Sequence, residues 1–112
     1  MKNSLKNSSE FGNVYKNGRS FADKLLVMYV IRNHTDENRL GISVSKRVGN
    51  SVVRHRATRL IREAYRLSSH MFNSGLDIVV VARAGIKDKG YSEVSEALLH
   101  LAGLHRILKK TD

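Results

Sequence analysis

The stretch over residues 45–66 constrains the fold more than any other part of the chain. Gly49 allows a tight turn and Asn50 is a favourable N-cap, so a helix is expected to begin here. The apolar residues that follow recur at i, i+4, i+7, i+8 and i+11, which is the spacing of one helix face. This spacing predicts a helix that ends near residues 67–68 and buries Val53, Ala57, Leu60, Ile61 and Ala64.

The opposite side of this helix carries a row of positive charge. Seven of the chain's 20 Lys and Arg residues lie within residues 45–66, and Glu63 is the single acid among them. A row of like charge is unfavourable in water, and surface helices usually mix both signs. A polyanion-binding face is therefore favoured over a solvated surface helix. At about 100° per residue, the residues opposite the apolar stripe are His55, Arg59, Arg62 and Arg66, with Arg54 and Arg56 on its two shoulders.

The composition narrows the class of protein. A formal net charge of +10 on 112 residues favours a nucleic acid or an anionic membrane as partner, and the length fits one domain over residues 1–112. Cysteine is absent, which excludes a disulfide framework and a thiolate metal cage. No run approaches the roughly 20 apolar residues of a membrane span, and the N-terminal MKNSLKNSSEF lacks the apolar core of a signal peptide. We therefore expect a soluble intracellular protein.

The N-terminal half predicts a helix and two strands. Residues 1–7 are expected to form a flexible arm anchored by Leu5, and Ser8 to cap a short helix that ends at a left-handed Gly18. Residues 21–32 are apolar and β-prone and predict a strand covered on both faces. The short polar link after it suggests an antiparallel hairpin with a second strand over residues 39–45.

The C-terminal half completes an α-β-β-α-β-α order. Residues 76–83 form the most continuous apolar run of the chain, which predicts a buried central strand. A turn over residues 84–90 leads to a last helix over residues 91–110. The order predicts an α+β sandwich in which helices pack on a small sheet.

The aromatic residues of the first helix allow two interpretations. Phe11, Val14 and Tyr15 lie at i, i+3 and i+4 and so share one helix face. All three could belong to the core. Alternatively, Phe11 and Tyr15 could form a stacking surface for unpaired bases, a use for which aromatic rings are suited.

The pattern of the basic stretch resembles the protein subunit of bacterial ribonuclease P. That family carries a strand ending in Ser-Val-Ser-Lys, then Gly-Asn, then an Arg-Asn-Arg core with further arginines along one helix face. The resemblance covers about residue 5 to the C-terminus. The matching residues here are Ser43-Val44-Ser45-Lys46-Arg47, Gly49-Asn50, Arg54-His55-Arg56, Arg59 and Arg62, together with Glu10-Phe11, Tyr15-Lys16, Gly18, Arg39-Leu40-Gly41-Ile42 and residues 77–83.

The resemblance implies a fold and a function beyond what periodicity indicates. The fold would be that of the second domain of ribosomal protein S5, with a left-handed βαβ crossover around the basic helix, against the usual right-handed preference. The RNA subunit would perform the chemistry, Mg²⁺-dependent removal of the 5′ leader from precursor tRNA, with Mg²⁺ held mainly by the RNA. The protein would be a monomer in the bacterial cytoplasm, one per RNA, with no membrane partner.

The resemblance also implies which residues bind RNA, and it assigns no catalytic or metal-ligating residue to the protein. Contacts to the ribonuclease P RNA would come from the basic helix and the loop before it, and the 5′ leader would lie between the first helix and the sheet. The implied RNA-binding residues are Lys46, Arg47, Asn50, Arg54, His55, Arg56, Arg59, Arg62 and Arg66. The implied leader-binding residues are Phe11, Tyr15, Tyr29, Thr58 and Arg62.

Two residues depart from the family pattern. His55 replaces the central asparagine of the Arg-Asn-Arg core, and Thr58 replaces a lysine usually found four residues after the first arginine. A histidine can still donate to a phosphate or stack on a base, and it gains charge towards pH 6.5. Thr58 offers only a neutral hydroxyl, so a leader or metal-associated contact is expected to be weaker there.

Three other kinds of function compete with this one. A protein-only active site is disfavoured, because no paired-carboxylate, H-x-x-x-H or nucleophile-elbow pattern surrounds the histidines. A ribosomal RNA-binding protein of related fold remains an alternative, since it would neutralise RNA phosphates in the same way as a ribonuclease P protein. The pairing of the basic helix with an aromatic surface would distinguish the ribonuclease P protein from it. A membrane-surface helix would need larger apolar residues than the Val, Ala, Leu and Ile of this stripe.

Overall fold

The computed structural model describes residues 3–110, which form three helices around one sheet of four strands. Short 3₁₀ helices at Ser69–Met71 and Ala84–Ile86 join the larger elements. The elements in chain order are α1 (Ser8–Asn17), β1 (Arg19–Ala22), β2 (Leu26–Arg32), β3 (Arg39–Ser43), α2 (Ser51–Ser68), β4 (Leu76–Ala82) and α3 (Tyr91–Leu104).

The sheet has the strand order β1-β2-β4-β3, so β4 is central, as its apolar sequence predicts. It pairs antiparallel with β2 and parallel with β3. The expected hairpin between the strands on either side of residues 33–38 is therefore wrong, because β4 lies between them. Crossing one strand requires only about 10 Å, which this link easily spans. The left hand expected for the β3–α2–β4 crossover stays a prediction.

The strand expected over residues 21–32 is broken into β1 and β2 by a turn at Asp23. The carboxylate of Asp23 accepts hydrogen bonds from the amides of Leu25 and Leu26, each at 2.9 Å. This side-chain bonding competes with strand pairing and reverses the chain, so that β1 pairs antiparallel with β2. The predicted element order otherwise holds, with β1 as an added edge strand.

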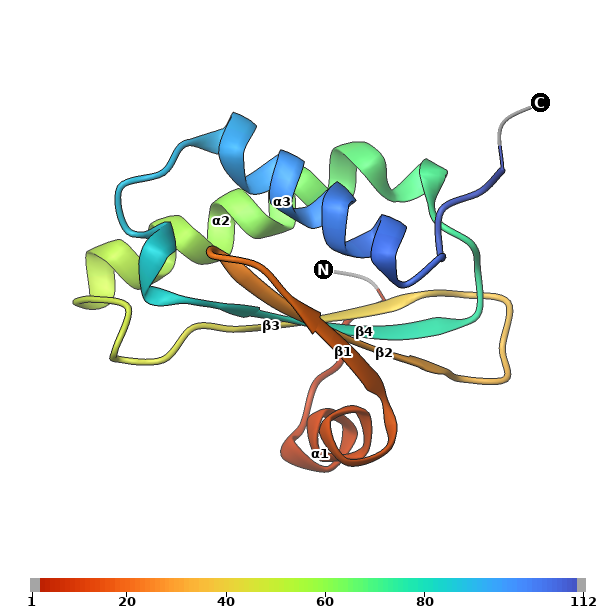
Figure 1. Cartoon of the computed structure of the whole chain (residues 1–112). Helices are drawn as coiled ribbons and strands as arrows, with labels where there is room; N and C mark the ends of the chain where they lie inside the picture. Colours follow the sequence, from red (N-terminus) through yellow and green to blue (C-terminus); the bar gives the residue numbers. More distant parts are fainter. Residues whose placement is uncertain (1–2, 111–112) are drawn as a thin grey trace.

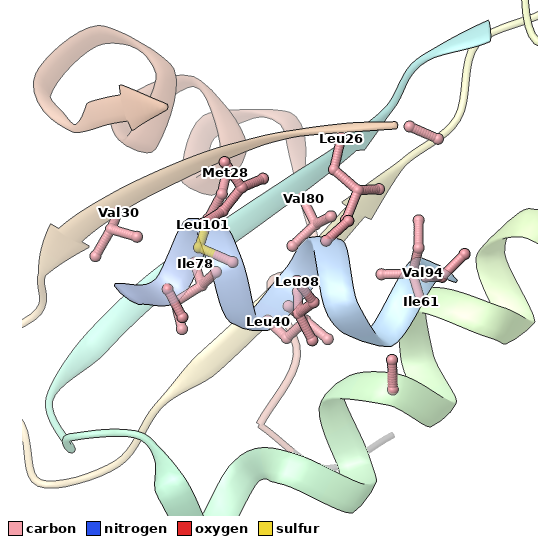
Figure 2. Close-up of a cluster of buried hydrophobic side chains, with 14 of the residues drawn as sticks. Leu26, Met28, Val30, Leu40, Ile61, Ile78, Val80, Val94, Leu98 and Leu101 are labelled. Carbon is pink, nitrogen blue, oxygen red and sulfur yellow. The ribbon is translucent and has the colours of Figure 1, made fainter. Parts of the chain in front are cut away.

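The sheet is covered on both faces, as the alternation in β2 predicts. Helices α2 and α3 pack on one face and α1 packs alone on the other (Figure 1). Figure 2 shows the larger cluster, in which β2 and β4 meet α3 and α2; it includes Leu26, Met28, Val30, Ile61, Ile78, Leu98 and Leu101. On the other face, Val14 of α1 is fully buried against Val79, with Tyr29 and Ile31 packed around them.

The last helix ends at Leu104 and not near Lys110. Arg106 adopts a left-handed φ of 57°, which ends the helix and turns the chain back. Ile107 is then buried, and Leu108 forms a bridge with Phe72. The apolar residues of this tail therefore pack against the segment after α2, where a continued helix would have carried them away from it.

The N-terminal expectations need three corrections. Residues 3–7 do not form a loose arm, because Ser4 bridges Leu40 of β3 and Leu5 is buried; residues 1–2 lie outside the described part. The N-cap of α1 is Asn7, whose side chain accepts from the amide of Glu10, and not Ser8. Gly18 has φ −85°, so it is not left-handed; glycine is needed because a Cβ would lie 2.6 Å from the carbonyl oxygen of Val14.

Candidate nucleic-acid interface

Helix α2 forms as its sequence predicts. The side chain of Asn50 accepts a hydrogen bond from the amide of Val53 at 3.0 Å, which confirms the expected N-cap. Ala57, Ile61 and Ala64 are buried, and Val53 and Leu60 pack partly buried against the same cluster. Burial of this stripe fixes the rotation of the helix, so its opposite side must face outward.

The outward side carries the predicted row of charge, which we call the basic face: His55, Arg59, Arg62 and Arg66. All four side chains are exposed. Glu63 forms an ion pair with Arg66 three residues on, which neutralises one charge of the row. Among the described residues, neither Arg59 nor Arg62 has a carboxylate partner. The unpaired charge is therefore concentrated in the middle of the helix.

The two shoulder arginines lie in different surroundings. Arg56 donates from Nη1 to the carbonyl oxygen of Lys89 at 2.8 Å, which ties α2 to the loop before α3. The Nε of Arg54 is the only buried side-chain nitrogen or oxygen in the described part of the chain that has no hydrogen-bond partner. A buried donor without an acceptor is costly, so the contacts of Arg54 within the protein leave one of its donors unsatisfied.

Thr58 is occupied by its own helix. Its hydroxyl donates to the carbonyl oxygen of Arg54 at 2.9 Å and the side chain is half-buried. It therefore does not extend into solvent as the lysine at this position in the family pattern would.

The loop before α2 presents two further cations. Lys46 and Arg47 are exposed, whereas Val48 is 4% exposed and its amide donates to the carbonyl oxygen of Ser45 at 3.1 Å. Gly49 follows where a Cβ would lie 2.8 Å from a methyl group of Val53. Val48 thus anchors the loop in the core and directs its charged neighbours to the same end of the molecule as the start of α2.

Across the sheet, α1 and β2 bring together an aromatic group of Phe11, Tyr15 and Tyr29. The ring centroids of Tyr15 and Tyr29 are 4.9 Å apart at an interplanar angle of 84°, and those of Phe11 and Tyr15 are 6.4 Å apart. Tyr15 is 40% exposed, while Phe11 and Tyr29 are half-buried. Of the three residues on this helix face, only Val14 belongs wholly to the core. The core interpretation therefore holds for Val14, and the rings of Phe11 and Tyr15 keep exposed surface.

An ion-pair network fixes α1 beneath the sheet. Arg39 of β3 donates to the carboxylate of Glu10 at 2.7 Å and to both oxygens of Asp77 at 2.9 and 2.6 Å. Asn33 also donates to Asp77 at 2.9 Å. Sequence reasoning missed this network, although the single carboxylate within the apolar run of β4 was a signal that it needed a buried partner.

The network shifts the pKa values of its members. Burial raises the pKa of Asp77, but the hydrogen bonds from Arg39 and Asn33 and the charge of Arg39 outweigh it, so the pKa lies below its usual value. The amide of Lys6, followed by the charge of Arg39, lowers the pKa of Glu10. Hydrogen bonding to Asp77 raises the pKa of Arg39 further. All three groups are therefore ionised near neutral pH.

The basic face and the aromatic group lie on opposite sides of the sheet, because α2 and α1 cover different faces (Figure 1). Strand β3 is the edge strand that contacts α2 and, through Gly41, the ring of Phe11. Thr58 and Arg62 therefore sit on the α2 side, and a leader that touched them and the aromatic group would have to pass around β3.

Residues 3–110 contain neither of two other kinds of site. No group of three or more His, Cys, Asp or Glu side chains in that range could hold a metal ion. None of the helices in the same range is both long and apolar enough to span a bilayer.

Comparisons with known proteins agree with this geometry. The sequence model of the Ribonuclease P family matches residues 1–106. The chain is 68% identical over 112 residues to the ribonuclease P protein component of Lachnoclostridium phytofermentans, covering 100% of this chain and 97% of that one. It superposes on the Staphylococcus aureus RNase P protein with a TM-score of 0.88, at 33% identity and with 97% of this chain and 100% of that one covered.

A more distant structure gives the same result. The Thermotoga maritima RNase P protein superposes with a TM-score of 0.82, at 29% identity, over 88% of this chain and 94% of that one. The family and the α+β fold expected from the sequence are thereby confirmed. This chain belongs to the bacterial ribonuclease P protein family, the protein component of the endoribonuclease that processes tRNA.

Proposed function

We propose that the chain binds ribonuclease P RNA through α2 and the loop before it, and holds the 5′ leader of precursor tRNA on the aromatic group. In this way it assists Mg²⁺-dependent removal of the leader. The observation that carries the proposal is the presence of two surfaces of different chemistry on one small domain. One offers unpaired arginines for phosphates, and the other offers partly exposed rings for unstacked bases.

The arrangement of charge on α2 supports the RNA-binding half. Arg59 and Arg62 lack carboxylate partners in the described structure, so binding them to a phosphate breaks no ion pair. Arg54 has a buried Nε that lacks an acceptor. Lys46, Arg47, Asn50, His55, Arg56 and Arg66 complete the proposed contact set, with Arg66 weakened by its pairing to Glu63.

The geometry of the aromatic group supports the leader-binding half. Tyr15 is exposed on α1 and its ring meets Tyr29 edge-to-face, an arrangement that holds both rings in fixed orientations. A fixed, exposed ring costs little entropy when a base stacks on it. Phe11 contributes as a supporting ring, since it packs against Gly41. We assign Thr58 and Arg62 to the margin of this path at the edge strand.

We place the catalytic Mg²⁺ on the RNA. An arginine-rich surface repels divalent cations, whereas RNA phosphates attract them. The protein would act as a monomer, one per RNA, in the bacterial cytoplasm.

Reconstitution tests the proposal. The protein is mixed with its own ribonuclease P RNA at low Mg²⁺, and cleavage of precursor tRNA is measured with and without protein. We expect stimulation of leader removal, weakened by Arg59→Gln and unchanged by Lys24→Gln, which removes the same charge at the exposed β1–β2 turn. If the partner RNA gains no activity, the chain is an RNA-binding protein of another kind.

A second comparison isolates the leader. Replacing Tyr15 by Ala should weaken binding of precursor tRNA by about 1–3 kcal/mol and leave binding of mature tRNA unchanged. Tyr91→Ala is the matched control, because Tyr91 is 38% exposed, close to the 40% of Tyr15, and lies on α3. An equal loss on both tRNAs would return Tyr15 to a structural role.

A further inference from the structure

A cavity of about 500 Å³ lies at the end of the sheet remote from the start of α2. The end of β2, the start of β4 and the segment after α3 meet there, and Figure 1 shows all three on the same side of the molecule. Helix α2 begins beyond the other end of the sheet, where Ser43 pairs with Val81. The cavity is therefore separate from the first turns of α2, and its size is that of a small-ligand site.

Three arginines line this cavity, which we call the arginine pocket: Arg19, Arg32 and Arg106. Arg19 pairs with Val30 across the β1–β2 ladder, and Arg32 lies two residues after Val30, so both side chains leave the sheet on its α3 face. Arg106 approaches from the end of α3. Side chains from three elements thus converge on one space.

The charge of the pocket is not neutralised. None of the three arginines forms an ion pair within residues 3–110, and no Asp or Glu lines the pocket. Arg19 lies over the ring of Phe21, with its guanidinium carbon 5.4 Å from the centroid. The acids that follow Arg32 in sequence, Asp36 and Glu37, are exposed on the β2–β3 loop and outside the lining.

The dipole of helix α3 opposes anion binding in the pocket, but its effect is smaller than that of the three arginines. The C-terminal end of α3 points towards the pocket and contributes roughly half a negative charge. Its last carbonyl oxygens are already engaged, because the amides of His105, Arg106 and Ile107 donate back to residues 101–103. Three full positive charges therefore dominate the pocket.

The walls of the pocket are held in place. His34, Gly75 and Arg106 line it with left-handed φ values of 61°, 82° and 57°, a conformation that non-glycine residues keep only when their surroundings enforce it. The amide of Asn33 donates to Gly75 at 2.9 Å and the amide of Asn73 to Ile107 at 2.7 Å. The loops around the pocket are thus bonded to one another, which favours a preformed site.

The lining combines this charge with apolar and polar surface. Val30 and Ile107 provide apolar wall, while Thr35, Asn73 and Ser74 provide hydrogen-bonding groups. A free phosphate would use only the arginines. A nucleotide would also place its sugar or base against the remaining wall.

We propose that the arginine pocket binds a nucleotide, with its phosphate between Arg19, Arg32 and Arg106. The nucleotide can belong to an RNA chain or be free, since the recognised chemistry is the same. This site is distinct from the basic face and the aromatic group, and the proposal does not rest on leader binding.

The test is NMR titration of the isotope-labelled protein with uridine 5′-monophosphate, uridine and a short oligouridylate. We expect saturable shifts of the amides of Gly75 and Arg106 with the monophosphate and not with uridine. Arg32→Gln should weaken this binding about tenfold, the worth of one charge-assisted hydrogen bond, whereas Lys24→Gln should not change it. Tighter binding of the oligomer would identify RNA as the source, and equal binding a free nucleotide.

A second variant guards against misfolding. Arg106→Asn removes the charge and keeps a residue type that tolerates φ above zero, so its fold should be retained and its affinity lost. Shifts that persist unchanged in both arginine variants, or an absence of shifts at Gly75 and Arg106, would overturn the proposal. Cleavage stimulation is measured separately, so that its failure would not be confused with failure here.

Discussion

The ion-pair network of Arg39 allows a sharp prediction, because it supports the only buried carboxylate in the described part of the chain. The side chain of Asp77 is 4% exposed, that of Arg39 is 37% exposed, and the two share a bidentate hydrogen bond. Arg39→Met keeps the aliphatic length and removes the charge. The variant leaves Asp77 ionised and buried, with only Asn33 donating to its side chain.

The expected cost follows from that geometry. Removing one partner of a buried ion pair typically costs about 3–5 kcal/mol. The lower limit applies here, since Asn33 keeps its bond and water can reach the partly exposed site of Arg39. Unfolding entropy of about 2.1 cal/mol/K per residue gives about 0.24 kcal/mol/K for 112 residues. A loss of about 3 kcal/mol therefore lowers Tm by about 13 °C.

The assay is urea and thermal unfolding of the wild type and the variant at neutral pH. Arg66→Met is the control, because the Arg66–Glu63 pair is also an arginine–carboxylate pair but both side chains are well exposed, and its loss should leave Tm unchanged. Adding Asp77→Asn to Arg39→Met should restore part of the lost stability, since the unpaired buried charge of Asp77 is then removed. A cost below about 1 kcal/mol would show that the network behaves as a surface pair and refute the reasoning.

The same network predicts a pH dependence. In the wild type the lowered pKa of Asp77 contributes stability above the unfolded value of about 3.9, and this contribution is lost as pH falls through the folded pKa. In Arg39→Met the effect of burial prevails and raises the pKa of Asp77. Protonation of Asp77 at lower pH then removes the unpaired buried charge and with it part of the destabilisation. The stability difference between the two proteins should therefore begin to shrink above about pH 4, at the raised pKa of Asp77 in the variant, and go on shrinking until the lowered pKa of the wild type is passed. A constant difference from pH 7 to pH 3 would contradict this assignment.

Three further predictions address the core, the basic face and a half-buried histidine. Gly41→Ala should cost about 1–3 kcal/mol, because its Cβ would lie 2.6 Å from the ring of Phe11, and Phe11→Leu should relieve it; a neutral Gly41→Ala in urea unfolding would show that the ring is free to move. Arg59→Gln should reduce the slope of log affinity for RNA against log salt by about 0.9, with Lys24→Gln as the control and an unchanged slope as the contrary result. Burial lowers the pKa of His105, so stability should fall as pH drops below about 6.5; an NMR titration that places its pKa above this value would contradict the assignment.

The basic helix could be predicted from sequence because all its determinants are local. Asn50 caps it, the apolar stripe fixes its rotation, and its charges follow from 100° steps. The resemblance to the family added the left-handed crossover and the assignment of RNA-binding and leader-binding residues. What sequence could not show was the pairing of Glu63 with Arg66, because an i,i+3 pair depends on rotamers and not on spacing alone.

The strand order could not be predicted in the same way. A short polar link between two β-prone runs favours a hairpin locally, and it gives no sign that a strand from residues 76–82 will separate them. The centre of the sheet goes to the run that is apolar on both faces, because only that position buries both. The break at Asp23 could have been predicted from the sequence, since an aspartate within an apolar run can accept hydrogen bonds from neighbouring backbone amides and end a strand.

The burial of each residue in the aromatic group depends on tertiary contacts that local sequence spacing does not show. Spacing placed Phe11, Val14 and Tyr15 on one face and left core and stacking surface equally open. The outcome depends on a residue far along the chain: Gly41 has no side chain, so the ring of Phe11 sinks against β3 and α1 rotates Val14 into the core. Tyr15 is then carried outward to meet Tyr29. The exposure of one ring is thus set by the absence of a methyl group on another strand, and Gly41→Ala is therefore expected to alter leader binding as well as lower stability.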